Sequence, residues 1–285
     1  MSSRSSTDLS TVIQFACTAD EEGAVPFPFC QLADNSADLH VRPVHVTLRD
    51  IRPSLQAGQR PTLDVQGFEV IDHVYAGLQE DIDDVWMAEY ERQMERVTCG
   101  PTSNMQLLCQ HLKARRVVSF AGVAVRRRNP ELDDAPIDTE NLQPSAGAHV
   151  DGNIQTGREV CTKVLELSDE DADTERYAVI NLWRPLRGPL IDAPLALCDT
   201  RTTGSADIIP TLDFYGPGSY IKFSDRQQWY YLRDMMPYEA LLFRCQDSTR
   251  HPDKGGITPH TGVWDEERRN DSYRQSIEVR CAVLY

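Results

Sequence analysis

The sequence predicts a mainly β protein, an antiparallel barrel or jelly roll with flanking helices packed outside it. Helical periodicity is confined to the first part of the chain, and short strand-like segments follow from about residue 117. The segment 274–285 then alternates with the period of a strand. Its apolar face is Ile277, Val279, Cys281 and Val283, and its polar face is Arg274, Ser276, Glu278 and Arg280. In a barrel covered by helices, a polar inward face indicates a functional cavity.

The bulk properties fit one large domain. The chain has 285 residues, and we expect residues 1–10 to be disordered and residues 11–285 to form a single domain, with a helical N-terminal part and a β core from about residue 117. The net charge of −15 argues against nucleic acid as a partner, because phosphate binding needs clustered Lys and Arg. We therefore expect a small-molecule substrate. The oligomeric state stays open, with a homodimer among the options.

The sequence also favours a cytoplasmic location. The opening residues are polar and Ser-rich, without the apolar core of a secretory signal. No apolar run approaches the roughly 18 residues of a membrane span. The eight cysteines are scattered, without a Cys-x-x-Cys pair, and we expect them to be reduced.

The elements of the first part are short strands and two helices. Residues 44–48 and 67–71 have strand composition, and the Pro- and Gly-containing segment 52–60 is expected to be a loop. Apolar residues recur at three- and four-residue steps over 81–97, which predicts an amphipathic helix. A second helix is expected over 103–113.

The rest of the chain is predicted as strands separated by loops. The Pro-rich, acidic segment 130–144 is expected to be a loop, and the acidic run 169–175 a solvated turn. Segments 220–223 and 228–232 look like a hairpin pair. The expected strands are 117–125, the segment around His149, 160–167, 177–183, 195–198, 220–223, 228–232, 239–244 and 276–284.

The candidate metal site begins with His149-Val150-Asp151. A histidine and an aspartate two apart on a strand point to the same side, so both can reach one metal ion. A second, distant histidine would complete a 2-His-1-carboxylate site, the arrangement associated with non-haem Fe(II) oxygenases. We favour His260, at the expected start of a strand, over His251, in an expected loop. The other histidines are interpreted as surface or structural.

A candidate carboxylate site follows His260. Arg274 and Ser276 stand two apart on the last strand and face the same cavity. The guanidinium is a two-pronged donor and the hydroxyl an additional one, so together they can hold a carboxylate. A co-substrate with one end on iron and a remote carboxylate fits this arrangement. The alternative is that Arg274 pairs with a surface acid such as Glu278.

These motifs resemble those of Fe(II)/2-oxoglutarate-dependent oxygenases. More narrowly, they resemble the AsaB-type hydroxylase/desaturase family, which includes the CmcJ proteins of the cephamycin pathway. The similarity covers most of the chain from about Val44. It is carried by His149–Asp151, Asn181–Leu186, Asp192–Asp199, Thr258–Thr261 and Arg274–Arg280, and upstream by Asp50–Arg52 and Gly67-Phe68.

The resemblance implies a double-stranded β-helix, a cupin-like jelly roll, and oxidation of a small metabolite in secondary metabolism. The outcome would be hydroxylation, desaturation or ring formation, with Fe(II), 2-oxoglutarate and O2 as cofactor and co-substrates. It implies that His149, Asp151 and His260 hold the iron and that Arg274 and Ser276 hold 2-oxoglutarate.

The substrate is a separate question. Arg184, after an apolar strand, and Arg280, on the polar face of the last strand, are candidate substrate-binding residues that would favour a carboxylate-bearing substrate such as an amino acid. The alternative is that Asp192 or Glu278 pairs with these arginines. Two other functions stay open: an iron oxidase that needs no 2-oxoglutarate, and a non-catalytic β-barrel binding protein.

Overall fold

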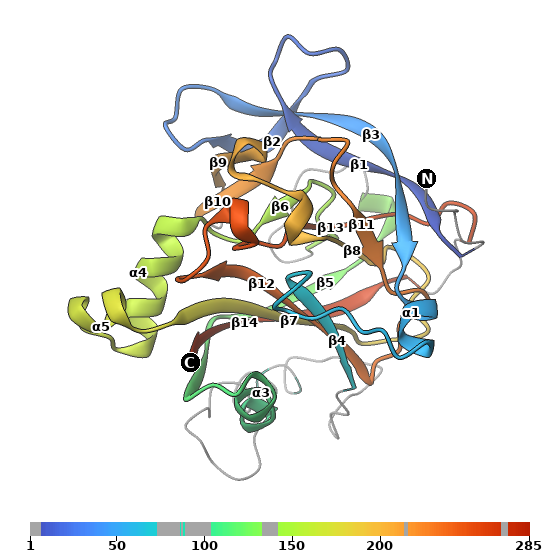
Figure 1. The fold of residues 1–285 in the computed structure, drawn as a ribbon. Helices are drawn as coiled ribbons and strands as arrows, with labels where there is room; N and C mark the ends of the chain where they lie inside the picture. Colours follow the sequence, from blue (N-terminus) through green and yellow to red (C-terminus); the bar gives the residue numbers. More distant parts are fainter. Residues whose placement is uncertain are drawn as a thin grey trace.

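Two β-sheets face each other in the computed structural model, with helices at the side and on the outer face (Figure 1). The structure describes residues 7–72, 86, 88, 104–132, 142–213, 216–268 and 273–285. Nearly all strand pairs are antiparallel, as the jelly-roll prediction requires, and the parallel pairing of β11 with β3 is an exception. The predicted fold class, a mainly β double-stranded β-helix with flanking helices, is confirmed.

The larger sheet has nine strands in the order β1-β3-β11-β8-β13-β6-β10-β9-β2. A further pairing of β2 with β3 joins the far edge back to the start of this sheet. The strands are β1 (Leu9–Cys17), β2 (Val25–Leu32), β3 (Asp38–Asp50), β6 (His149–Val150), β8 (Leu195–Cys198), β9 (Ile208–Asp213), β10 (Gly216–Ile221), β11 (Trp229–Tyr231) and β13 (His260–Gly262).

The smaller sheet has five strands in the order β4-β12-β7-β14-β5. They are β4 (Phe68–Asp72), β5 (Arg116–Arg127), β7 (Tyr177–Pro185), β12 (Glu239–Asp247) and β14 (Gln275–Leu284). The two central strands, β7 and β14, are joined by an unbroken antiparallel ladder, so the inward side chains of both strands lie in adjacent rows. This ladder forms one wall of the candidate site.

Four α-helices are described: α1 (Arg52–Gln56), α3 (Asn104–Leu112), α4 (Ile154–Leu165) and α5 (Asp169–Thr174). Short 3-10 turns occur at η1 (Pro130–Leu132), η2 (Thr200–Thr202), η3 (Ser205–Asp207) and η4 (Pro252–Lys254). Helix α3 lies on the outer face of the smaller sheet (Figure 1), where Leu108 packs in one cluster with Ile277 and Val279. The expected helix over 103–113 and the expected apolar outer face of the last strand are thereby confirmed.

The main core fills the space between the two sheets. It combines Phe15 and Trp229 of the larger sheet with Phe68, Trp183 and Phe243 of the smaller one. Even-numbered residues of β7 instead pack outward in a second cluster with Leu108, because side chains alternate along a strand. Strand β7 is therefore buried on both faces, and a polar residue on its inner face has to find a partner inside the barrel.

The N-terminal part differs from its prediction. Strands β1, β2 and β3 occupy most of residues 9–50, so this part is not helical and the β core does not begin at about residue 117. The expected disorder over 1–10 is wrong for Leu9 and Ser10, which begin β1. The segment 52–60, expected to be a loop, opens with α1. The helix predicted over 81–97 lies outside the described residues, except that Trp86 and Ala88 are helical.

Three further expectations are wrong. Segment 160–167 is not a strand but the end of α4, because the Asn153 side chain caps the helix and Cys161 and Leu165 recur at helical spacing on its buried side. The acidic run from Asp169 forms α5, capped by Ser168. Strands β10 and β11 are not a hairpin, since β10 pairs with β6 and β9 while β11 pairs with β3 and β8.

Candidate active site

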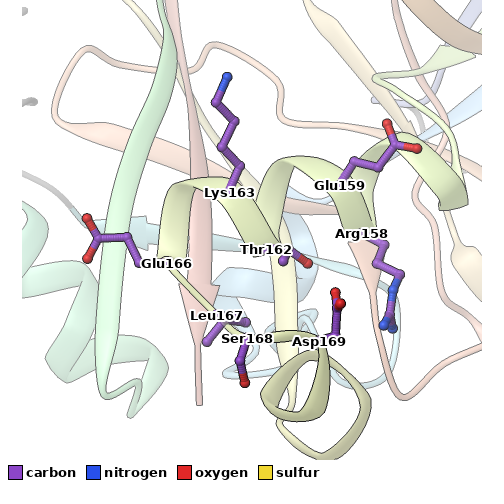
Figure 2. Close-up of a pocket in the computed structure, with 8 residues that line it drawn as sticks. All are labelled: Arg158, Glu159, Thr162, Lys163, Glu166, Leu167, Ser168 and Asp169. Carbon is purple, nitrogen blue, oxygen red and sulfur yellow. The ribbon is translucent and has the colours of Figure 1, made fainter.

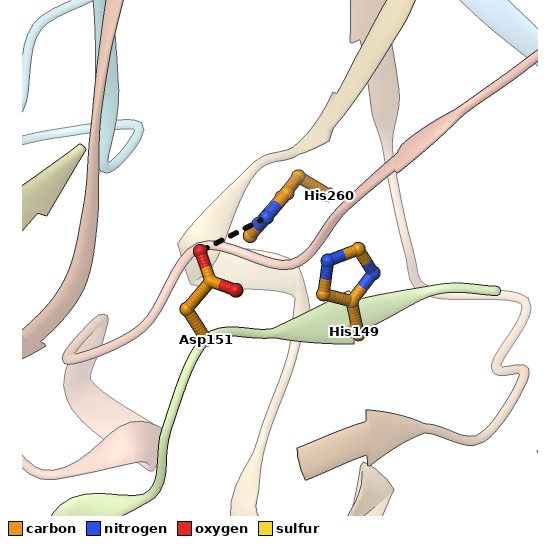
Figure 3. A group of neighbouring side chains, drawn as sticks. All are labelled: His149, Asp151 and His260. Carbon is orange, nitrogen blue, oxygen red and sulfur yellow. Dashed lines mark ion pairs between the residues drawn. The ribbon is translucent and has the colours of Figure 1, made fainter. Parts of the chain in front are cut away.

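Three side chains converge at one end of the space between the sheets. His149, Asp151 and His260 each offer a ligand atom, and these atoms all lie within 4.8 Å of one another. Figure 3 shows the two imidazoles and the carboxylate turned toward a common point. The structure thus brings together the residues that the sequence proposed as a 2-His-1-carboxylate set.

Strand pairing explains this convergence. His149 and His260 stand directly opposite each other on β6 and β13, which are antiparallel neighbours in the larger sheet. Their ring centroids are 4.3 Å apart. Asp151 follows β6 immediately, at the position where the chain leaves the sheet to enter α4. The ladder therefore places both histidines side by side, and the His-x-Asp spacing adds the carboxylate.

Both imidazoles are held in a form that can bind a metal. Nδ1 of His149 lies 2.7 Å from the carbonyl oxygen of Gly147, and Nδ1 of His260 lies 3.3 Å from that of Thr258. A carbonyl only accepts, so each Nδ1 carries the proton and each Nε2 keeps a free lone pair. Burial lowers the pKa of His149 to about 4 and also lowers the pKa of His260, so both rings are neutral at physiological pH.

The carboxylate is held ionised. Burial alone would raise the pKa of Asp151, but the positive charge of Arg280, the two imidazoles and the Asn181 amide outweigh this effect and keep the pKa well below its usual range. Arg280 donates a hydrogen bond to Oδ1 over 2.7 Å, and Asn181 donates one to Oδ2 over 2.6 Å. Two neutral imidazoles and one carboxylate are a suitable donor set for a divalent iron ion.

Arg274 lies in the same cavity as the three candidate ligands, as does Ser276. Arg274 is 3% exposed. Its guanidinium donates through Nε to the Ser276 hydroxyl over 2.8 Å and through Nη1 to the Ala193 carbonyl over 2.9 Å, and its central carbon lies 5.0 Å from the Trp183 ring centre. Burial lowers its pKa to about 9. Within the part of the chain that the structure describes, its side chain forms no ion pair, so the expected alternative pairing with Glu278 is absent.

Some cavity residues were missed by the sequence reasoning. Arg126 and Ala124 line the cavity from β5, opposite Ser276 and Glu278 of β14 in the ladder. Ala124 and Arg126 stand two residues apart on β5, so their side chains share one face of the strand, and this spacing could have indicated that both face the cavity. Gly262 was also missed: a Cβ atom there would lie 3.0 Å from Pro144 Cβ and from the Ser145 carbonyl oxygen and 3.3 Å from Arg274 Nη1, so the glycine relieves crowding beside the guanidinium.

The two candidate substrate-binding arginines have other surroundings. Arg184 is fully buried, but it neighbours Trp183 on β7 and therefore points to the opposite face, away from the cavity. Asp192, considered as its partner, instead pairs with Arg128 over 2.9 Å. Arg280 contacts Asp151, and its Nε lies 3.6 Å from Glu278 Oε1, so the protein itself supplies the anions that Arg280 needs. The inference of a carboxylate-bearing substrate loses its basis.

His251, the rejected alternative ligand, lies elsewhere. Its side chain is 59% exposed, caps the short turn η4 and sits 3.2 Å from the Asp253 carboxylate. It belongs to a surface turn and is absent from the cavity lining among the described residues.

A second, wider hollow lies on the surface along α4 and α5 (Figure 2). Figure 2 shows its charged side chains, among them Arg158, Lys163 and Glu166, spread over an open face. Arg158 already pairs with Asp173 over 2.7 Å. The hollow lacks converging donor atoms, so we place the candidate active site in the cavity between the sheets.

Comparison with known proteins places this architecture in a family. The family model described as "Oxidoreductase/YMDC permease-like domain" matches residues 16–284. The chain belongs to this family. Among the described residues, no helix is both long enough and apolar enough to cross a membrane.

The names of two relatives of this chain state a type of reaction. The hydroxylase/desaturase asaB of Aspergillus flavus is 37% identical over 131 residues, which is 39% of this chain and 56% of asaB, so the match spans little more than half of that relative. The alpha-ketoglutarate-dependent dioxygenase tstK of Talaromyces stipitatus is 24% identical over 246 residues, or 84% of each chain.

A solved structure shares the fold. The iron and alpha-ketoglutarate-dependent endoperoxidase NvfI superposes with a TM-score of 0.72 at 24% identity, over 98% of this chain and 99% of that one. The agreement extends over both sheets and so supports the double-stranded β-helix assignment.

Proposed function

We propose that this chain is a non-haem Fe(II)- and 2-oxoglutarate-dependent dioxygenase that oxidises a small metabolite in secondary metabolism. 2-Oxoglutarate is the alpha-ketoglutarate in the names of its relatives. The observation that carries the proposal is the juxtaposition of two groups in one cavity. One is the His149–Asp151–His260 donor set, and the other is the buried guanidinium of Arg274 beside Ser276.

The geometry suits a co-substrate with two ends. Fe(II) would be held by Nε2 of His149 and His260 and by the carboxylate of Asp151, which leaves coordination positions open. The remote carboxylate of 2-oxoglutarate would meet Arg274 and Ser276. Burying an unpaired guanidinium is costly, so a bound carboxylate would supply the charge that Arg274 lacks in the described structure. Glu278 and Asp192 favour the charge of Arg274 without forming an ion pair with its side chain among the described residues, so a bound carboxylate would add the direct pair.

The bound iron and 2-oxoglutarate supply the oxidising chemistry. In a hydroxylation, one oxygen atom of O2 enters a C–H bond of the substrate and the other enters succinate, while C1 of 2-oxoglutarate leaves as CO2. The protein positions the reactants and excludes water. Asp151 stays ionised, His149 and His260 stay neutral, and Trp183 covers one face of the Arg274 guanidinium.

The choice between hydroxylation, desaturation and ring formation depends on how the substrate sits. Because Arg184 points away from the cavity and Arg280 pairs with Asp151 and Glu278, neither of these two arginines supports a carboxylate-bearing substrate. Arg126 and Glu278 are the remaining ionisable groups that line the cavity, and they are the candidates for substrate contacts.

The test is anaerobic reconstitution followed by turnover. The wild-type protein should bind about one Fe(II) per chain, and succinate should form only when Fe(II), 2-oxoglutarate and O2 are all present. A screen of small metabolites for succinate formation above the uncoupled background would then find the substrate. His149→Ala and Asp151→Ala should each lose both iron and turnover.

Two other results would redirect the assignment. Substrate oxidation that continues without 2-oxoglutarate would indicate an iron oxidase in which Arg274 and Ser276 grip the substrate's own carboxylate. A protein that binds no iron under anaerobic conditions would indicate a non-catalytic barrel.

A further inference from the structure

Asp151 is held from across the barrel by two residues of the smaller sheet. Asn181 on β7 donates to Oδ2 over 2.6 Å, and Arg280 on β14 donates to Oδ1 over 2.7 Å. Asn181 and Arg280 are direct partners in the β7–β14 ladder. One pair of directly opposite residues in the smaller sheet therefore holds the Asp151 carboxylate, which follows β6 of the larger sheet.

The two residues that hold Asp151 differ in burial, and the buried one, Asn181, needs a hydrogen-bond partner at this position. Asn181 is fully buried in the middle of a strand, where an apolar residue would pack without any need for a hydrogen-bond partner. Its amide nitrogen donates to the side-chain carboxylate of Asp151. The Arg280 side chain is 27% exposed and is balanced by Asp151 and by Glu278, whose Oε1 lies 3.6 Å from Nε. The side chains of Asn181 and Arg280 therefore both contact carboxylates: Asn181 contacts Asp151, and Arg280 contacts Asp151 and Glu278.

We propose that Asn181 and Arg280 are positioning residues that fix the Asp151 carboxylate for the metal. This inference rests on the proposed function. Each carboxylate oxygen accepts one donor, so rotation of the carboxylate about its Cβ–Cγ bond would break both hydrogen bonds together. The carboxylate is therefore kept in one orientation before a metal arrives, and the metal does not have to impose that orientation itself. Outer partners of this kind typically change metal affinity by roughly 10- to 100-fold.

The same inference accounts for the Asn181–Leu186 motif of the sequence. Two of its inward residues, Asn181 and Trp183, contact the two groups of candidate ligands in the cavity. Asn181 holds the candidate metal ligand, and Trp183 packs on Arg274, the candidate 2-oxoglutarate ligand. Leu182 and Arg184 point to the other face of β7.

The experiment measures binding of Co(II), a redox-stable divalent probe, to the metal-free full chain. In Asn181→Leu and Arg280→Met, the dissociation constant for Co(II) should rise roughly 10- to 100-fold, and the visible absorption spectrum of bound Co(II) should change. Arg280→Lys keeps the positive charge and should recover part of the lost affinity. The control is Arg244→Met, which removes a buried arginine of the smaller sheet that donates to the Gly255 carbonyl and not to Asp151. It should lower the melting temperature but leave Co(II) affinity and spectrum unchanged.

The outcomes separate this inference from the proposed function. If the wild type fails to bind Co(II), or if His149→Ala binds it as tightly as the wild type, the proposed function fails. If the wild type binds Co(II), His149→Ala does not, and both Asn181→Leu and Arg280→Met match the wild type in affinity and spectrum, only the positioning role is overturned. Should Asn181→Leu fail to fold, Asn181→Ser, which is smaller and too short to reach Asp151, replaces it with the same expected loss.

Discussion

Replacing Arg274 by methionine should separate co-substrate binding from stability. The guanidinium is buried, its described side-chain partners are the neutral Ser276 hydroxyl and Ala193 carbonyl, and burial lowers its pKa to about 9. Methionine replaces the unbranched stem of arginine as far as Nε and carries neither the charge nor the donors. Loss of a charge-assisted hydrogen bond costs on the order of 1.5–3 kcal/mol, so the KM for 2-oxoglutarate should rise roughly 10- to 150-fold.

The stability of the Arg274→Met variant should be equal to or higher than that of the wild type. Arg274 is a buried cation that lacks a described ion-pair partner, and replacing such charges by apolar groups is often neutral or stabilising. The ligand-free Arg274→Met protein should therefore melt no lower than the wild type. A simple structural arginine would show the opposite behaviour, with reduced stability and unchanged co-substrate affinity.

The assay is a titration of 2-oxoglutarate at saturating Fe(II), with succinate as the readout and iron content measured in parallel. Ser276→Ala should be milder, because it removes one neutral donor and leaves the charge in place. An unchanged KM in Arg274→Met, or a loss of iron together with turnover, would refute the reasoning, since both would mean that Arg274 does not hold the co-substrate.

Three further predictions follow from the structure. His260→Ala should abolish iron binding and turnover while His251→Ala keeps both, as measured by iron content and succinate formation, and the reverse pattern would show that the wrong distal histidine was chosen. The metal-free protein should lose stability as the pH falls from about 7 toward 4, because the pKa of His149 is about 4 in the folded state and near 6.5 in the unfolded chain. At pH 5 this difference lowers the free energy of unfolding by about 2 kcal/mol. Urea unfolding measured across this pH range should show a smaller loss of stability in His149→Gln. Asn153→Ala should lower the free energy of unfolding by about 1 kcal/mol through loss of the α4 cap, whereas Asn153→Asp, which preserves a capping side chain, should not.

Local patterns in the sequence predicted which of the candidate ligands lie together, although not the surroundings of Arg184 and Arg280. The His149-x-Asp151 spacing and the alternation of Arg274, Ser276, Glu278 and Arg280 depend only on the period of a strand, and the structure reproduces both. The fold class followed from the same kind of pattern.

Pairings between distant strands could not be predicted in this way. Segments 220–223 and 228–232 are close in sequence, but in a double-stranded β-helix each pairs with strands from elsewhere, so β10 lies beside β6 and β11 beside β3. The partners of Arg280 and Asn181 were hidden for the same reason, because the contact with Asp151 crosses from one sheet to the other.

The error at α4 had a different cause. Residues 160–167 are rich in apolar side chains, and that composition fits a buried strand as well as one face of a helix. The decisive signal was the capping box formed by Asn153 and Thr156, which starts a helix directly after the metal-site strand. Ser168 and Asp171 give the same signal at the start of α5.

The direct opposition of His149 and His260 on β6 and β13 has a consequence for how the protein acquires its metal. These strands are far apart in the sequence, and closing the long loop between them costs chain entropy that only the assembled barrel repays. An unfolded or newly made chain therefore offers His149 and Asp151 but no third ligand at a fixed distance. Iron should be captured only after β6 and β13 have paired within the larger sheet, so the bound metal should stabilise the folded state and should not act as a template for folding.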